Sequence, residues 1–203
     1  MKYDFSFFDE CIERRGTNCY KWDSLIAQQG REMLPMWVAD MDFCCPTEVT
    51  EALINRASHP IYSYTEHSTT AIDAMLGFMH RHHQVNLTRE QQVTLPCVVT
   101  GLRTAVRALT QTGDRVLIQS PVYGPFFAVV KENDRTLVEN KLVADAQGRY
   151  TMDFESMETA FAEGVKLALL CSPHTPVGRV WTLDELTRVY TLCKQYDVTL
   201  VVD

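Results

Sequence analysis

The sequence has 203 residues, 46% of them hydrophobic, a net charge of −7 and an isoelectric point near 5.4, as expected of a globular protein that buries one good core. The acidic balance argues against nucleic acid and against an anionic membrane surface as partners. No apolar run approaches the roughly 18 residues of a membrane span, and the first ten residues lack the layout of a secretory signal, so we expect a cytoplasmic protein.

The arrangement of the cysteines argues against both disulfides and a metal. The seven cysteines are odd in number and form no C-x-x-C pair, which predicts reduced cysteines that serve packing. Cys171 and His174 have metal-like spacing, as do His80, His82 and His83, but neither group has the second ligand pair of a closed zinc site. We therefore expect no bound metal.

Residues 1–46 are dense in aromatic and charged side chains and show no long helical or strand period, which predicts an arm that packs on another part of the protein. Residues 35–43, PMWVADMDF, alternate enough for a short strand with Asp40 and Asp42 on one side. Two carboxylates can serve acid/base chemistry. At this spacing on a strand they are more often exposed or capping groups, and both interpretations stay open.

Two helices are predicted next. The first begins near Thr47 and has apolar positions at helical spacing as far as Ala57. The second covers residues 70–83, and its stripe of Ile72, Met75, Phe78 and Met79 is expected to be core rather than a cofactor contact.

From Cys97 onward, strand and helix patterns alternate. Strands are predicted over residues 97–100, 115–119, 136–139, 165–171 and 198–203, and helices from Gly101 and over 124–132, 153–162 and 183–195. Thr182 to Glu185 reads T-x-x-E, a capping box that begins the last helix. The alternation predicts an α/β fold with a mostly parallel, doubly wound sheet. The apolar strand 198–203 should be central, so we expect these residues to be the first part of a longer protein.

Four segments are expected at one edge of this sheet, where ligands of open α/β sheets bind: residues 100–102, 121–123, 172–178 and Asp203. The amides of Gly101 and Leu102 open a helix and would favour a phosphate. Neither G-x-G-x-x-G nor a P-loop is present, which argues against NAD and ATP.

Two side chains at this edge suit a charged aromatic ligand. Tyr123 lies between two prolines and could cover a flat ring, although a buried core tyrosine is an equal alternative. Asp203 ends an apolar strand, where a carboxylate needs a cation such as a protonated pyridine nitrogen. Phosphate, flat ring and ring cation together describe pyridoxal 5′-phosphate.

At this point the sequence resembles the fold-type I pyridoxal-phosphate enzymes of the aminotransferase class I/II superfamily, within them the MalY/PatB-type cystathionine β-lyases. PMWVADMDF and PHTPVGRVW carry the resemblance most specifically, and RRGTNCYKWD, QSPVYGPF and the terminal VVD support it. The likeness covers the whole chain in order but only the N-terminal half of such an enzyme. It implies that residues 1–46 are an N-terminal arm and part of the small domain, and that 47–203 are the first, incomplete part of the large, cofactor-binding domain.

The resemblance also implies a role for individual residues. It makes Gly101 and Leu102 the phosphate cradle, Tyr123 the ring-stacking residue and Asp203 the partner of the pyridine nitrogen. Tyr64 would reach the phosphate of a neighbouring subunit, which implies a homodimer, and the Ala39 backbone would meet the substrate carboxylate. Thr175 replaces an asparagine that donates to the ring hydroxyl, and a threonine is shorter and differently aimed.

The implied activity is carbon–sulfur β-elimination from cystathionine or a cysteine S-conjugate, which gives pyruvate, ammonia and a thiol. An aminotransferase and a truncated, non-catalytic product are the alternatives, and the sulfur substrate stays open. The family's Schiff-base lysine would follow Asp203, and none of the six lysines lies in that context. No catalytic residue is therefore assigned, and we expect this chain alone to be inactive.

Overall fold

The computed structural model describes residues 3–203, and the chain divides into two compact units, Met1–Ala71 and Ile72–Asp203. Each unit is described by itself. The division expected after residue 46 concerns the domains of a whole protein and stays a prediction.

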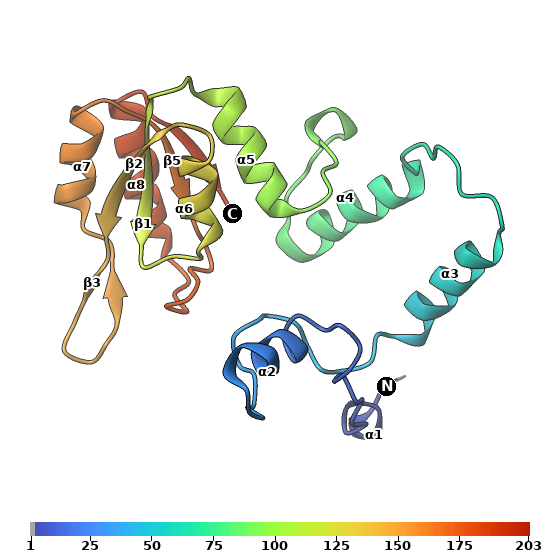
Figure 1. Ribbon diagram of the computed structural model, residues 1–203. Coiled ribbons are helices and arrows are strands. Elements are labelled where there is room, and N and C mark those ends of the chain that lie inside the picture. Colours follow the sequence, from blue (N-terminus) through green and yellow to red (C-terminus); the bar gives the residue numbers. More distant parts are fainter. Residues whose placement is uncertain (1–2) are drawn as a thin grey trace. The chain divides into compact units, whose positions relative to one another are not determined.

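The second unit is built on a four-stranded sheet whose order is β2-β1-β5-β6. The strands are β1 (Arg115–Ser120), β2 (Thr136–Lys141), β5 (Val165–Leu170) and β6 (Thr199–Val202), and every neighbouring pair is parallel. The connecting helices are α6 (Pro125–Lys131), α7 (Phe154–Ala162) and α8 (Leu183–Gln195), while α5 (Val98–Leu109) precedes β1 (Figure 1). The predicted α/β fold with a parallel sheet is confirmed.

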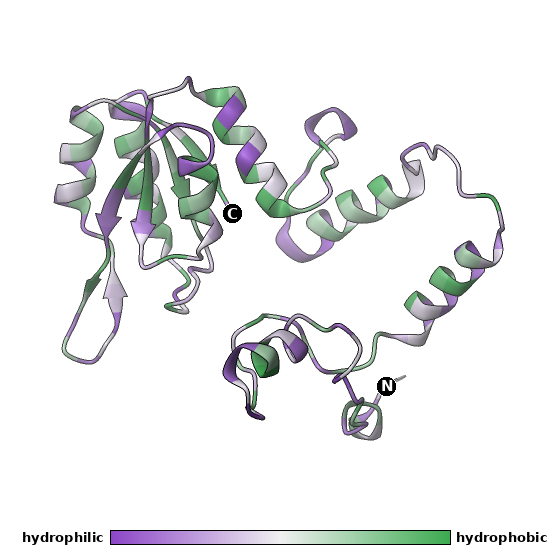
Figure 2. Cartoon of the chain, viewed as in Figure 1, coloured by the Kyte–Doolittle hydropathy of each residue, from purple (hydrophilic) through white to green (hydrophobic). Residues whose placement is uncertain are grey.

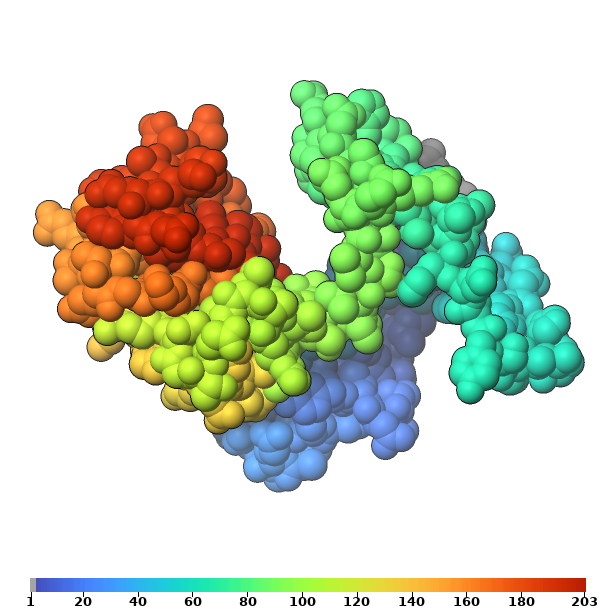
Figure 3. All heavy atoms as spheres, turned by 90° about the horizontal axis from the view of Figure 1, so that it is seen from above, coloured from blue at the N-terminus to red at the C-terminus, as the bar shows by residue number. Residues whose placement is uncertain are grey.

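Helices cover both faces of this sheet. Alternate residues of β1 point to opposite faces, so that Val116 and Ile118 pack with α5 and α6, while Leu117 packs with α7 and α8. Figure 2 shows hydrophobic residues gathered in these strands and on the helices, and in Figure 3 the same segments, yellow-green to red, form one densely packed body. Two cores result, one on each side of the sheet, as doubly wound folds require.

Local sequence signals place the helix starts. The Thr182 hydroxyl accepts a hydrogen bond from the Glu185 amide at 3.2 Å, and the Glu185 carboxylate accepts one from the Thr182 amide at 2.8 Å, which confirms the capping box of α8. Asp153 caps α7 through the Ser156 amide in the same manner.

One prediction about this unit is wrong. Residues 97–100 form no strand, because the apolar spacing of α5 continues back to Val98 and only Cys97 remains extended. Within this chain β6 lies at the edge of the sheet, and Val202 is 57% exposed, while its expected central place in a longer protein stays a prediction. The sequence also gave no sign of a short hairpin formed by β3 (Val143–Ala144) and β4 (Tyr150–Thr151), which joins β2 to α7.

The first unit contains short helices joined by loops: α1 (Phe5–Phe8), α2 (Asp23–Gln29) and α3 (Thr47–Ser58). Residues 35–43 form no strand, and their conformation is instead set by ion pairs described below. Helix α4 (Thr69–His83) begins at the boundary of the units and is followed by the 3-10 helix η1 (Arg89–Gln91). The apolar stripe of α4 is not core in this chain, since Phe78 is 49% exposed and no α4 residue is buried.

Within residues 3–203, no helix combines the length and the apolar character that crossing a membrane demands.

Candidate functional site at the carboxyl edge of the sheet

Backbone hydrogen bonds join three of the four expected segments at the carboxyl ends of β1, β5 and β6. The Tyr123 amide donates to the Thr175 carbonyl at 2.8 Å, which ties the loop after β1 to the loop after β5. The Ser172 amide donates to the Asp203 carbonyl at 2.8 Å, and the Asp203 amide donates to the Leu170 carbonyl at 2.9 Å. Tyr123, Thr175 and Asp203 therefore belong to one continuous rim, as the sequence predicts.

The fourth segment is the beginning of α5, and here the expected donors need a correction. The helix begins at Val98, so its amides without an intrahelical partner are those of Val98, Val99 and Thr100. The Gly101 amide already donates to the Cys97 carbonyl at 3.1 Å. Leu102, the fifth helical residue, has its amide in the helical ladder. The amides outside the helical ladder thus belong to the three residues directly before Gly101.

An open pocket of about 390 Å³ brings the start of α5 together with the end of β6. Its lining residues come from the segment before α5, the first turns of α5 and the end of β6: Val93, Leu95, Cys97, Val98, Gly101, Leu102, Val201, Val202 and Asp203. Gly101 and Leu102 thus form part of the pocket wall, while their amides donate within the helix and are not available to a ligand. A Cβ at Gly101 would stand 3.3 Å from the Leu95 Cδ1 atom, so a side chain there would crowd the pocket wall.

Asp203 is the acidic group of this pocket. Burial raises the pKa of its carboxyl above the usual aspartate value. Desolvation without a neighbouring cation has this effect, and a cation placed beside the carboxylate would reverse it. Burial also raises the pKa of the Cys171 thiol, and a hydrogen bond from the Thr175 amide offsets part of this increase.

Tyr123 and Thr175 face outward from the rim. The Tyr123 side chain is 48% exposed, which excludes the alternative of a buried core tyrosine. Thr175 is also exposed, and its carbonyl is the group that holds the Tyr123 amide. Both side chains are therefore accessible to a ligand.

Sequence reasoning gave no role to His174 or Arg179, and both hold the loop after β5. The His174 ring, 1% exposed, lies with its Nε2 atom 2.9 Å from the Pro121 carbonyl and so joins the loops after β1 and β5 a second time. The Arg179 guanidinium makes two hydrogen bonds to the Glu185 carboxylate, at 2.8 and 2.7 Å, and stacks over Trp181. The sequence signal that could have found them is their place in the short loop between the end of β5 and the capping box that begins α8.

Ala39 and Tyr64 belong to the other unit and are not among the residues joined at the rim. Ala39 is exposed, and the Tyr64 side chain is fully exposed. Their expected roles rest on the resemblance alone.

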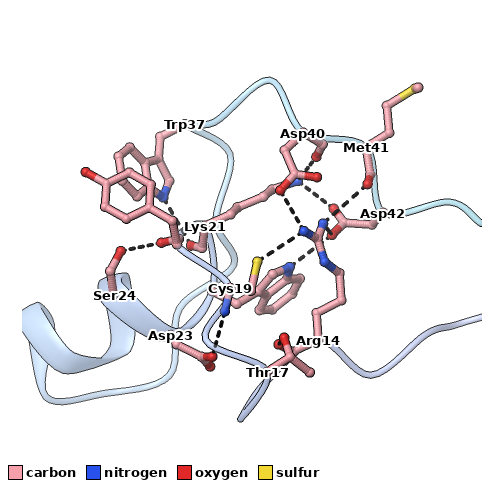
Figure 4. Close-up of polar contacts among 12 residues, drawn as sticks. Arg14, Thr17, Cys19, Lys21, Asp23, Ser24, Trp37, Asp40, Met41 and Asp42 are labelled. Carbon is pink, nitrogen blue, oxygen red and sulfur yellow. Dashed lines mark hydrogen bonds and ion pairs between the residues drawn. The ribbon is translucent and has the colours of Figure 1, made fainter. Parts of the chain in front are cut away.

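Asp40 and Asp42 are held as ion-paired carboxylates (Figure 4). Arg14 contacts Asp40 at 2.6 Å and Asp42 at 2.5 Å, and Lys21 contacts Asp42 at 2.6 Å. The Arg14 contact lowers the pKa of Asp40, while Lys21, then Trp22 and Arg14, hold the pKa of Asp42 far below its usual value. Both stay ionised at neutral pH, so neither has a proton to give as an acid, and their lowered pKa values make each a weaker base than an ordinary carboxylate, which argues against the acid/base interpretation.

Among residues 3–203, no group of three or more histidine, cysteine and acidic side chains has an arrangement that could hold a metal ion. The structure contains seven free cysteines, so no disulfide joins them.

Comparison with known proteins gives a consistent result. The family model described as aminotransferase class I and II matches residues 32–203. Cystathionine beta-lyase PatB of Bacillus subtilis is 42% identical over 198 residues, which cover 97% of this chain and 51% of that protein. Protein MalY of Escherichia coli is 30% identical over 199 residues, with 97% and 51% covered.

Solved structures show the same relationship. Cystalysin from Treponema denticola, which contains pyridoxal 5′-phosphate, has a TM-score of 0.91 and 34% identity, and the match covers all of this chain and 52% of that one. A putative aminotransferase from Clostridium difficile, also bound to pyridoxal phosphate, has a TM-score of 0.91, 36% identity and coverage of 97% and 51%. The chain thus spans about half the length of the relatives that it matches.

Proposed function

Because this chain belongs to the aminotransferase class I and II family, we propose that the complete protein is a pyridoxal-phosphate-dependent carbon–sulfur β-lyase of amino-acid metabolism. Its substrate would be cystathionine or a cysteine S-conjugate, and its products pyruvate, ammonia and a thiol. The observation that carries the proposal is the shared pocket, which Val98, the first residue of α5, and Asp203, at the end of β6, line together. The 42% identity to a cystathionine β-lyase favours the lyase over other activities of the family.

The residues of the pocket fit this cofactor. A helix of 12 residues begins there, and its first amides and dipole suit a phosphate. Asp203, whose pKa is raised because burial leaves its charge uncompensated, suits a protonated pyridine nitrogen. Tyr123 and Thr175 are accessible on the same rim for the ring face and the ring hydroxyl.

Each residue would then act by binding and orientation. Pyridoxal 5′-phosphate, when bound, supplies an electron-withdrawing ring that stabilises the charge left after a proton departs from the substrate α-carbon. Asp203 would keep the pyridine nitrogen protonated. The α5 amides would fix the phosphate end, and Tyr123 would limit access of water to one ring face.

Thr175 stands where the resemblance places an asparagine. Its hydroxyl is a single donor on a shorter side chain, so we expect a weaker hold on the ring hydroxyl than the asparagine would give. The Ala39 backbone would meet the substrate carboxylate, and Tyr64 would reach the phosphate of a second subunit, which makes the complete protein a homodimer. We also propose that it acts in the cytoplasm.

No residue of this chain is proposed as the base. Of the described lysines, Lys21 is paired with Asp42, and the others lie on α6, β2, β5 and α8. We therefore expect a polypeptide of these 203 residues, supplied with the cofactor, to release no pyruvate.

A coupled assay tests the proposal. The complete protein, loaded with pyridoxal 5′-phosphate and given cystathionine without a keto acid, should release pyruvate and thiol in equal amounts. Strict dependence on a keto-acid acceptor would instead identify an aminotransferase. This is the second candidate function, and the 36% identity to a putative aminotransferase of known structure supports it.

A further inference from the structure

The segment that carries Ala39 is folded into a tight turn. The Asp40 amide donates to the Val38 carbonyl at 2.8 Å, a hydrogen bond across one residue that closes a γ-turn with Ala39 at its centre. This bond uses the amide of Asp40 and the carbonyl of Val38, so the amide of Ala39 stays outside the turn. Among residues 3–203, the Ala39 amide donates to no carbonyl.

One end of this turn is fixed by an aromatic contact. The Trp37 indole donates to the Lys21 carbonyl at 3.2 Å, and its ring lies 4.9 Å from the Tyr20 ring, centroid to centroid. Residue 37 is therefore held against the loop that precedes α2.

The other end is fixed by a single guanidinium that bridges two carboxylates. Arg14 donates to Asp40 from Nη2 and to Asp42 from Nη1, and the same Nη1 reaches the Met41 carbonyl at 3.3 Å (Figure 4). Only the planar fork of arginine offers donors spaced to hold both carboxylates at once.

Lys21 adds a second cation to this cluster. Its ammonium, on a side chain only 8% exposed, donates to the Asp40 carbonyl and to the Asp42 carboxylate, both at 2.6 Å. The Trp22 indole adds a third bond to Asp42, at 2.9 Å. Asp42 is thus contacted by two cations and one indole, more than a solvated surface carboxylate requires.

We propose that Arg14 and Lys21 are positioning residues that fix the Ala39 turn so that its backbone can receive the substrate carboxylate. The inference rests on the proposed function, which assigns that carboxylate to Ala39. Neither cation has its charge free for the substrate, because both are satisfied by Asp40 and Asp42. Their contribution is the shape of the turn.

The test replaces Arg14 by lysine in the complete protein, because lysine keeps the charge but holds only one carboxylate at a time. Arg89→Lys is the matched control, since Arg89 also makes two hydrogen bonds to one aspartate, Asp73, on an exposed surface. Asp42→Asn is a second variant, which removes the negative charge that Arg14 and Lys21 share and replaces one acceptor oxygen by a donor.

The first readout is ligand affinity, measured as competitive inhibition by methionine and by 3-(methylthio)propylamine, which is methionine without its carboxyl group. Arg14→Lys and Asp42→Asn should weaken methionine about tenfold and leave the amine unchanged, with unchanged cofactor affinity. Equal weakening of both inhibitors, or of neither, would overturn the proposal.

The second readout is amide hydrogen exchange of residues 37–42 in the cofactor-free protein, which does not depend on activity. Exchange there should become about tenfold faster in Arg14→Lys and stay unchanged in Arg89→Lys. If the wild-type protein releases no pyruvate, the proposed function fails, and this exchange still decides whether the cluster orders the turn. A variant that no longer folds would contradict the proposal, because the cluster would then support the whole unit instead of one turn.

Discussion

At the scale of single residues, backbone hydrogen bonds place Tyr123, Thr175 and Asp203 on one rim at the carboxyl ends of β1, β5 and β6. Tyr123, Thr175 and Asp203 were expected on one rim because each follows a parallel strand, and hydrogen bonds join their segments. Gly101 was expected to offer a free amide, but the helix begins earlier and uses that amide. A helix start can be shifted by one turn without changing the apolar pattern, which is why periodicity did not locate it.

Cys97 and Cys193 illustrate how position controls reactivity. The Cys97 sulfur is exposed at the start of α5, and the Thr100 hydroxyl, then the Thr100 and Val99 amides, lower its pKa. Burial raises the pKa of Cys193 to about 11. At pH 7.5 we expect iodoacetamide to alkylate Cys97 at least tenfold faster than Cys193, because the thiolate is the reacting form.

Peptide mass spectrometry over time gives both alkylation rates, and Cys97 should be protected by pyridoxal 5′-phosphate. Equal rates for the two cysteines would contradict the described environments of their sulfur atoms.

The carboxylates of Asp40 and Asp42 predict a response to acid. Their pKa values are lowered from the ordinary 3.8, so the stabilisation they provide is present above about pH 4 and is lost as the pH falls through the lowered values. Exchange protection of residues 37–42, corrected for intrinsic rates, should be constant between pH 7 and 5 and should decrease only below about pH 4. A decrease between pH 7 and 5 would show that another group controls the turn.

At the scale of elements, the helices and strands with several agreeing local signals were predicted correctly, and those that depend on distant contacts were not. Helix α8 has the predicted bounds of 183 and 195, since a capping box and an apolar stripe agree there. The expected strand over residues 35–43 failed because its alternation comes from Asp40 and Asp42, which are fixed by Arg14 and Lys21 from a distant segment. Contacts of this kind are not visible in a local pattern.

Helix α5 permits a direct test of its first amide. Proline is tolerated at the first position of a helix and removes one donor, and Cys97 before it is already extended with φ −161° and ψ 164°. Val98→Pro should therefore preserve the fold and weaken pyridoxal 5′-phosphate about tenfold, the loss of one hydrogen bond to a charged group of roughly 1.5 kcal/mol.

The matched control is Leu183→Pro at the first position of α8, where Thr182 is also extended and the side chain is 78% exposed. Thermal unfolding checks both folds, and equilibrium dialysis gives the cofactor affinity. An unchanged affinity in Val98→Pro, or an equal loss in Leu183→Pro, would remove the α5 amide from the site.

At the scale of the whole molecule, the α/β class, the parallel sheet and the family were all accessible from the sequence, because alternating buried strands and helices constrain the topology strongly. The position of β6 within the sheet could not be predicted from the sequence, because an apolar strand can lie at the centre of a sheet or at an edge that another segment covers. The same holds for α3 and α4, which bury no side chain within this chain although both are amphipathic.

The central claim is that the rim holds a phosphorylated, positively charged pyridine through Asp203. It is tested most directly by equilibrium dialysis of pyridoxal 5′-phosphate against the complete protein and its Asp203→Asn variant, with pyridoxine 5′-phosphate as a second ligand that cannot bond covalently to a lysine. We predict that Asp203→Asn weakens both ligands at least tenfold, because the amide cannot pair with the ring cation. Equal affinity of the two proteins for both ligands would contradict the account.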